Sequence, residues 1–209
     1  FKYPVDTDQF ELIREQNLVY VDKTDLLFDL ASRYRYVFLA RPRRFGKSLL
    51  CNTFKAYFQG QKELFEGLKI MDLEKEWKTY PVLHFDMSDL KNYNIQEAKS
   101  NLERQLRSYE AIYGSDPESI TVGARFSDLI HNAHKQTGEK AVVIFDEYDA
   151  PLLDVVHKKD QLDQLRHIMR NFYSPLKYSD PHLQLPFLTG ITKFSQLSIF
   201  SSLNNLKNI

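Results

Sequence analysis

The amino-acid sequence predicts an α/β fold in which a parallel β-sheet carries helices on both faces. Short, continuous apolar runs alternate with amphipathic helical segments from about residue 20 to the end of the chain. Such runs are typical of parallel strands buried on both faces, and their alternation with helices is typical of strand–helix–strand units. At 209 residues the chain is long enough for one complete core, so we expect one main domain.

The first predicted strand lies between two predicted helices and is followed by a basic loop. A helix is expected to begin within residues 22–25 and to present three leucines on its apolar face. Tyr36–Ala40 is a compact run of β-forming residues and predicts a buried strand. From Lys47 onward, apolar residues recur at helical spacing until Gly60, a typical helix stop. The order is therefore strand, loop, helix.

Further strands and helices are predicted downstream, and no internal repeat or low-complexity linker separates them. Gly114 is a stop signal for the first of the helices. Pro186 lies near the start of the last strand, where a missing N–H donor is tolerated. The predicted strands are residues 81–86, 141–145 and 185–190, and the predicted helices are Ile95–Tyr113, 126–135 and 160–173.

Composition and charge exclude several classes of protein. The 28 basic residues balance 28 acidic ones, so net charge provides no general attraction to nucleic acid or to a membrane surface, and only a local basic patch stays open. No apolar run approaches the roughly 18 to 20 residues that span a bilayer. One cysteine, Cys51, excludes an intramolecular disulfide framework, so we expect a cytoplasmic protein. The missing initiator methionine and the abrupt end at Ile209 suggest a fragment of a longer protein.

Residues 41–48 match most of a phosphate-binding loop. A glycine-containing turn between a strand and a helix lets backbone N–H groups and the helix N-terminus converge on a polyphosphate. Lys47 is expected to reach the β- and γ-phosphates, and the Ser48 hydroxyl to bind Mg²⁺. Arg41 stands where the pattern has its first glycine, so a chance Gly-Lys-Ser triplet is the alternative interpretation. The residues expected to bind nucleotide are Arg41, Pro42, Arg43, Arg44, Phe45, Gly46, Lys47, Ser48 and Leu49.

An acidic pair follows the most apolar strand and supports the interpretation of the loop. In magnesium-dependent nucleotide hydrolysis, an aspartate at such a strand end holds the metal and a neighbouring glutamate polarises the attacking water. Asp146 and Glu147 fit these roles. A solvated strand end is the alternative for either residue alone, but the joint occurrence of both motifs favours a nucleotide site. A nuclease cluster that also uses Asp149 and Asp154 is disfavoured, because the chain has no matching lysine after Asp146.

Two threonines and three arginines are further candidates. Thr189 and Thr192 follow the last predicted strand and are expected to hydrogen-bond the γ-phosphate or the attacking water if that strand lies between the other two; ordinary strand-end threonines are the alternative. Arg41, Arg43 and Arg44 place three guanidinium groups beside the phosphate site, where they either neutralise charge, contact an acidic neighbour or form a solvated loop. Cys51 shows no metal spacing and is expected in the core.

With these motifs in view, the chain resembles the bacterial AAA-ATPase-like family, whose members often carry a PD-(D/E)XK nuclease-like domain downstream. The likeness covers nearly the whole chain. It rests on residues 20–24, 41–48, 64–68 and 145–149, on Thr189-Gly190 and on residues 203–206. Under this resemblance, Arg41 belongs to the family's own form of the loop.

The resemblance implies an AAA-like, additional-strand P-loop NTPase domain, a three-layer sandwich at residues 35–209, with a short N-terminal helical extension at residues 1–34 packed on the core. It places the Thr189 strand between the loop strand and the Asp146 strand, with Thr189 as sensor, and puts residues 20–24 near the nucleotide base or the loop. It also implies ATP and Mg²⁺ as cofactors and ATP hydrolysis with catalytic Glu147, Lys47 and Thr189 and metal ligands Ser48 and Asp146. A non-hydrolysing nucleotide switch stays open as the alternative, as do an oligomer and a nucleic-acid partner; a membrane partner is not expected.

Overall fold

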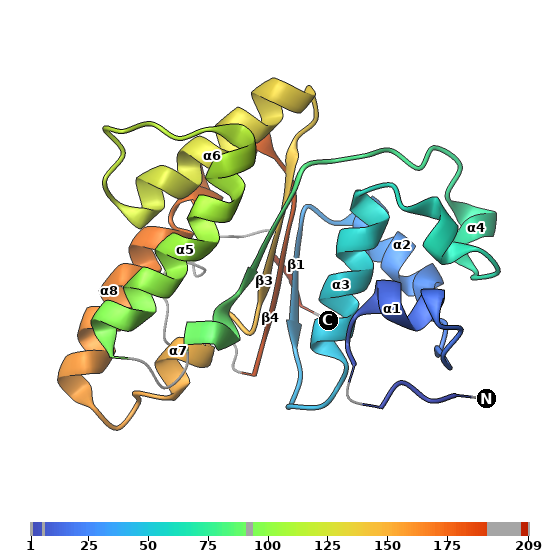
Figure 1. The fold of residues 1–209 in the computed structure, drawn as a ribbon, viewed down its shortest axis with the longest axis horizontal. Coiled ribbons are helices and arrows are strands. Elements are labelled where there is room, and N and C mark those ends of the chain that lie inside the picture. The colour runs from blue at the N-terminus through green and yellow to red at the C-terminus, as the bar shows by residue number, and fades with distance from the viewer. Residues whose placement is uncertain (1, 6, 91–93, 192–205, 209) are drawn as a thin grey trace.

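The computed structural model describes residues 2–5, 7–90, 94–191 and, for the backbone alone, 206–208. Its centre is a sheet with strand order β2-β3-β4-β1-β5, in which every neighbouring pair is parallel (Figure 1). The strands are β1 (Tyr36–Ala40), β2 (Val82–Asp86), β3 (Ala141–Asp146), β4 (Leu183–Gly190) and β5 (Leu206–Asn208). The α/β class and the position of β4 between β1 and β3 are therefore confirmed.

Helices cover both faces of the sheet and give three layers (Figure 1). Helices α5, α6 and α8 lie on one face, and α3 lies on the other with α1, α2 and α4 outside it. The α-helices are α1 (Phe10–Glu15), α2 (Thr24–Arg33), α3 (Lys47–Phe58), α4 (Ile70–Leu73), α5 (Ile95–Tyr113), α6 (Val122–Thr137), α7 (Ala150–Leu153), α8 (Lys159–Tyr173) and α9 (Pro175–Tyr178). Short 3₁₀ turns are η1 (Lys62–Phe65), η2 (Met87–Leu90) and η3 (Asp180–His182).

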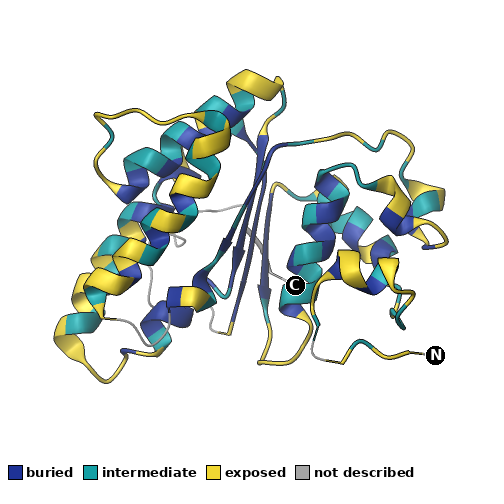
Figure 2. Cartoon of the chain, in the orientation of Figure 1, coloured by how far each residue is buried: buried dark blue, intermediate teal, exposed yellow. Residues whose placement is uncertain are grey.

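Two apolar cores lie on opposite faces of the sheet, and β1 to β4 are buried along most of their length (Figure 2). Side chains of β3 alternate between them because successive residues of a strand point to opposite faces. Val143 and Phe145 pack under α5, α6 and α8, whereas Val142 and Ile144 pack under α3. This double burial explains why the strands appear in the sequence as continuous apolar runs.

Most predicted elements are confirmed, and several of their boundaries shift by one to four residues. The helix predicted at residues 126–135 begins at Val122, because the Thr121 hydroxyl accepts a hydrogen bond from the Ala124 N–H and caps the helix. The strand predicted from residue 185 begins at Leu183, which pairs with Ala141. The third strand continues through its acidic end to Asp146. The boundary at residue 34 stays a prediction, and Thr192 and residues 203–205 lie outside the described residues.

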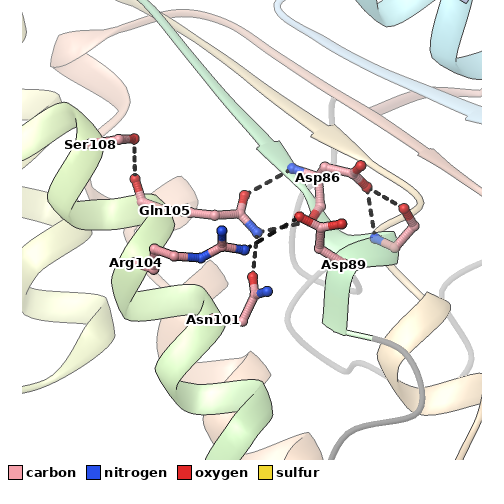
Figure 3. Close-up of polar contacts among 7 residues, drawn as sticks. Asp86, Asp89, Asn101, Arg104, Gln105 and Ser108 are labelled. Carbon is pink, nitrogen blue, oxygen red and sulfur yellow. Dashed lines mark hydrogen bonds and ion pairs between the residues drawn. The ribbon is translucent and has the colours of Figure 1, made fainter.

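Strand β2 lies at one end of the sheet order, and two side chains of α5 cover its outer edge. The Tyr109 hydroxyl accepts from the His84 N–H at 2.8 Å and donates to the His84 carbonyl at 2.9 Å. One turn earlier, the Gln105 amide accepts from the Asp86 N–H at 3.0 Å and donates to the Asp86 carbonyl at 2.9 Å, as Figure 3 shows for this pair. Asn101 holds the Gln105 amide from the same helix. Four backbone groups that an edge strand would leave open to another strand are thus paired.

Within the described ranges, none of the helices has both the length and the apolar character that a bilayer crossing requires.

Candidate nucleotide site

The predicted phosphate loop connects the carboxyl end of β1 to the first turn of α3. Residues 41–46 are exposed, and the turn is made by two residues in the left-handed region, Arg44 with φ 66° and Gly46 with φ 72°. Gly46 adopts this conformation without steric cost, whereas an arginine with its Cβ does not. Ligands of open parallel sheets bind at the carboxyl ends of the strands, which is where this loop lies.

Lys47 is the one residue of the loop motif that is buried, with 4% of its surface exposed. Its ammonium donates to two carbonyls of the loop, those of Arg41 at 3.1 Å and Pro42 at 2.8 Å. The positive charge is therefore held against the loop backbone. Ser48 follows in the first turn of α3 and is half-buried.

Asp146 and Glu147 are joined to the end of β4 through Thr189. The fully buried Thr189 hydroxyl donates to Asp146 Oδ1 at 2.6 Å and accepts from the Glu147 N–H at 3.0 Å. The Thr189 carbonyl accepts from the Tyr148 N–H at 2.8 Å. Glu147 has a positive φ of 52°, so the chain turns sharply directly after β3. One threonine thus fixes the backbone and one carboxylate of the acidic segment.

Gly190, the next residue of β4, connects the acidic segment to the phosphate loop. Its carbonyl accepts from the Arg41 N–H at 3.1 Å, at the start of the loop. A Cβ at Gly190 would lie 2.5 Å from the Tyr148 ring and 2.9 Å from a carboxylate oxygen of Asp149. The Asp149 carboxylate also accepts from the Ile191 N–H at 3.0 Å. The Thr189-Gly190 pair therefore connects both predicted motifs.

Cys51 and His84 lie near the acidic segment but are enclosed. Cys51, one turn after Lys47, is fully buried, and burial together with the neighbouring Asp146 raises the pKa of its thiol well above its usual range. Its assignment to the core is confirmed. His84 Nε2 is buried without a hydrogen-bond partner among the described residues, and burial followed by the nearby Lys55 lowers the pKa of the imidazole.

A cavity of about 650 Å³ opens beside the phosphate loop and is lined mainly by apolar side chains. Tyr20, Val21 and Lys23 come to it from the segment before α2, and Phe45 and Gly46 from the loop. The remaining lining residues are Pro4, Ile13, Val19, Leu26, Leu27, Asp29, Leu30, Leu39, Arg41, Leu49, Leu50 and Thr53. Its volume and apolar lining fit a flat organic group held next to the loop.

The donor set fits a magnesium ion that arrives with a nucleotide. The described residues contain no group of three or more histidine, cysteine or acidic side chains able to hold a metal by themselves. Magnesium bound to nucleoside phosphates needs no such cage, because phosphate oxygens and water supply most ligands and the protein adds one carboxylate and one hydroxyl. Asp146 and Ser48 are groups of these two kinds.

The structure brings together most of the predicted site residues. The loop, Asp146, Glu147 and Thr189 share one edge of the sheet, linked by the hydrogen bonds to Thr189 and Gly190. Sequence reasoning missed the contact of Gly190 with the Tyr148 ring and most of the cavity lining. The available signals were the glycine that follows a buried strand and the apolar residues of the N-terminal segment.

The sheet order and the loop define an α/β protein of the P-loop NTPase type. A model of the family described as "Predicted AAA-ATPase" matches residues 4–200, and the chain belongs to this family. An uncharacterized protein in the vnfD 5′ region of Azotobacter chroococcum mcd 1 is 37% identical over 209 residues, which cover 100% of this chain and 40% of that protein. The chain thus spans well under half of the length of this relative.

Proposed function

We propose that the chain binds ATP with Mg²⁺ and hydrolyses it. The observation that carries this proposal is the end of β4, where Thr189 and Gly190 fasten the acidic segment and the phosphate loop to one strand. Catalysis of phosphoryl transfer depends mainly on positioning and on charge stabilisation. A single rigid strand between the two motifs supplies the positioning.

The loop and the first turn of α3 would hold the polyphosphate. Backbone N–H groups of residues 43–48 would donate to phosphate oxygens, and Lys47 would add the positive charge. The ammonium exchanges the carbonyls of Arg41 and Pro42 for the β- and γ-phosphates. Ser48 and Asp146 would hold the magnesium ion, which neutralises charge on the phosphates when it is bound.

Glu147 is the proposed general base for the attacking water. Its backbone is fixed by the Thr189 hydroxyl, while its carboxylate belongs to a half-buried side chain at the sheet edge. Thr189 itself acts as a positioning residue, because its hydroxyl already serves Asp146 and the Glu147 N–H. We propose that Thr189 senses the phosphates through these two neighbours.

The cavity beside the loop is the proposed site of the base. Apolar walls from Val21 and Leu49 suit the faces of a purine, and Tyr20 and Lys23 bring polar groups to the same space. The chain lacks an Asn-Lys-x-Asp element for reading guanine, so adenine is the proposed base. Under this assignment, residues 20–23 upstream of α2 contribute to binding of the base.

A nucleotide-dependent switch without turnover is the second candidate. The observation in its favour is the Lys47 ammonium bound to the loop's own carbonyls, since a nucleotide must displace these bonds and so changes the loop. In either case the remainder of a longer protein, such as a nuclease-like domain, would read the state of the site.

Titration calorimetry with Mg·ATP and Mg·GTP, followed by a structure with a non-hydrolysable ATP analogue, tests the proposed site. We expect magnesium-dependent binding that prefers ATP, with the base in the cavity and the metal at Ser48 and Asp146. Wild-type binding that persists in Lys47→Ala, or phosphates bound elsewhere, contradicts the proposal. Binding without turnover in the full-length protein selects the switch.

A further inference from the structure

The phosphate loop carries two arginines whose side chains have no role in the proposed nucleotide site. Arg43 and Arg44 are both exposed, and neither forms a hydrogen bond or an ion pair with any residue in the described part of the chain. Several other exposed cations of this chain do have acidic partners, for example Arg35 with Asp180 at 2.7 Å. The two guanidinium groups are thus available to a partner outside the domain.

Arg44 occupies a position at which glycine would be more stable. Its φ of 66° lies in the left-handed region, which is unfavourable for a residue with a Cβ and carries no steric penalty for glycine. A non-glycine residue in such a conformation at a ligand-binding loop indicates a functional constraint. The guanidinium group is the part of Arg44 that glycine lacks, so we look to the side chain for that constraint.

The geometry of a phosphate loop separates its backbone from these side chains. The concave inner face of such a loop is formed by N–H groups that converge on the phosphates. We use the term outer face for the exposed side chains of Arg43, Arg44 and Phe45. The inner face of this loop is also where the Lys47 ammonium is held by the carbonyls of Arg41 and Pro42. Under the proposed function these backbone groups and Lys47 hold the nucleotide, which leaves the guanidinium groups of Arg43 and Arg44 without a role there.

An aromatic ring stands beside the two arginines. Phe45 is 65% exposed and also borders the cavity next to the loop. Guanidinium groups bind phosphates through their planar donor fork, and an exposed ring stacks on an unpaired base. The sequence Arg43-Arg44-Phe45 therefore presents two phosphate ligands and one stacking platform within three residues.

We propose that the outer face of this loop, formed by Arg43, Arg44 and Phe45, binds single-stranded nucleic acid. Unpaired strands fit better than a duplex, because only their bases are free to stack on Phe45. An acidic protein surface would satisfy the arginines but would leave the exposed ring without a stacking partner. Since the net charge of the chain is zero, the attraction is local to this loop.

The position of this surface links it to the nucleotide. The same six-residue turn carries nucleic acid on its outer face and, under the proposed function, phosphates on its inner face. Binding of one ligand therefore changes the affinity for the other, and linkage requires the change to be reciprocal. This coupling rests on the proposed function, whereas binding of nucleic acid to the outer face does not.

Fluorescence anisotropy of a labelled 20-residue oligothymidine with the nucleotide-free protein tests the proposal. We expect saturable binding. A plot of the logarithm of the association constant against the logarithm of the salt concentration should have a slope of about −1.4, the value for two neutralised phosphates on a single strand. Binding then weakens about sevenfold between 50 and 200 mM salt. Arg43→Gln/Arg44→Gln should weaken binding at least about tenfold, and Phe45→Ala at least about fivefold.

Arg107→Gln/Arg170→Gln is the matched control, since it removes the same charge from exposed positions of α5 and α8 on the opposite face of the sheet. Arg44→Gly should raise the stability of the fold and still weaken binding. Absence of oligonucleotide binding at 50 mM salt, equal affinities of the loop variant and the control, or a preference for duplex overturns the proposal.

Discussion

The Thr189 hydroxyl donates to the Asp146 carboxylate at 2.6 Å and accepts from the Glu147 N–H at 3.0 Å. A fully buried hydroxyl that donates to one residue and accepts from the other fixes the two residues relative to each other. The predicted sensor residue therefore also links β4 to the proposed metal ligand, Asp146, and to the proposed general base, Glu147.

Replacing this hydroxyl should affect stability and turnover together. Thr189→Val keeps the volume but leaves the Glu147 N–H without its acceptor and Asp146 without its donor, so we expect a loss of about 1–3 kcal/mol in urea unfolding. ATP turnover should fall at least about tenfold. Thr189→Ser keeps the hydroxyl and should retain most of both. Equal behaviour of the two variants would show that the hydroxyl has no positioning role.

The close approach of Gly190 and Tyr148 gives a second test. Gly190→Ala adds a Cβ 2.5 Å from the Tyr148 ring and should destabilise the fold by about 1–3 kcal/mol. In a Tyr148→Leu background the same substitution should cost clearly less, because the ring is the obstacle. A double-mutant cycle in urea measures this coupling, and additive effects would contradict the steric account.

The covered edge of β2 should keep the sheet from pairing with a second copy. Gln105→Leu with Tyr109→Phe removes the groups that pair with the backbone of His84 and Asp86, so we expect a loss of about 2–4 kcal/mol for the pair of substitutions and self-association that grows with concentration. Sedimentation velocity checks the association. Ser108→Ala on the same helix is the control and should stay monodisperse to the same degree as the wild type.

Stability should fall as the pH drops below about 6.5, with His84 as one contributor. Burial and Lys55 lower the pKa of His84, with Asp146, Asp86 and Asp8 opposing them, so the folded state favours the neutral imidazole. The unfolded chain takes up the proton below its ordinary pKa of about 6.5, which makes the contribution complete above that pH and lost as pH falls toward the lowered folded value.

His84→Gln should therefore flatten the dependence of unfolding free energy on pH between 7.5 and 5.5. His167→Gln, at an exposed position of α8, is the matched control and should leave the wild-type slope unchanged. Parallel curves for His84→Gln and the wild type would remove His84 from this explanation.

Local patterns in the sequence were sufficient for β1 to β4, the main helices and the two motifs, but not for β5. Each depends on residues near one another in the chain, such as the apolar run before Asp146 or the triplet Gly46-Lys47-Ser48. Hydrogen bonds between residues far apart in the sequence could not be predicted from such local patterns. Nothing local indicates that the Thr189 hydroxyl serves two residues of β3 and its turn, or that Gln105 and Tyr109 close the edge of β2.

The left-handed turn at Arg44 also escaped sequence reasoning, since arginine does not favour that conformation. The cavity beside the loop depends on the packing of the N-terminal segment and α2 against α3. Local sequence patterns do not predict this packing. The prediction that residues 20–24 lie near this site came only from the resemblance to a known family.

The most direct test of the central claim is steady-state ATP turnover with Mg²⁺, measured together with ATP binding for the wild type, Lys47→Ala, Glu147→Gln and the exposed control Glu118→Gln. Loss of the ammonium should abolish tight binding, and loss of the base should lower turnover by about 10²-fold or more while binding persists. The control should match the wild type. Wild-type turnover in Lys47→Ala and Glu147→Gln would contradict the proposed ATPase site.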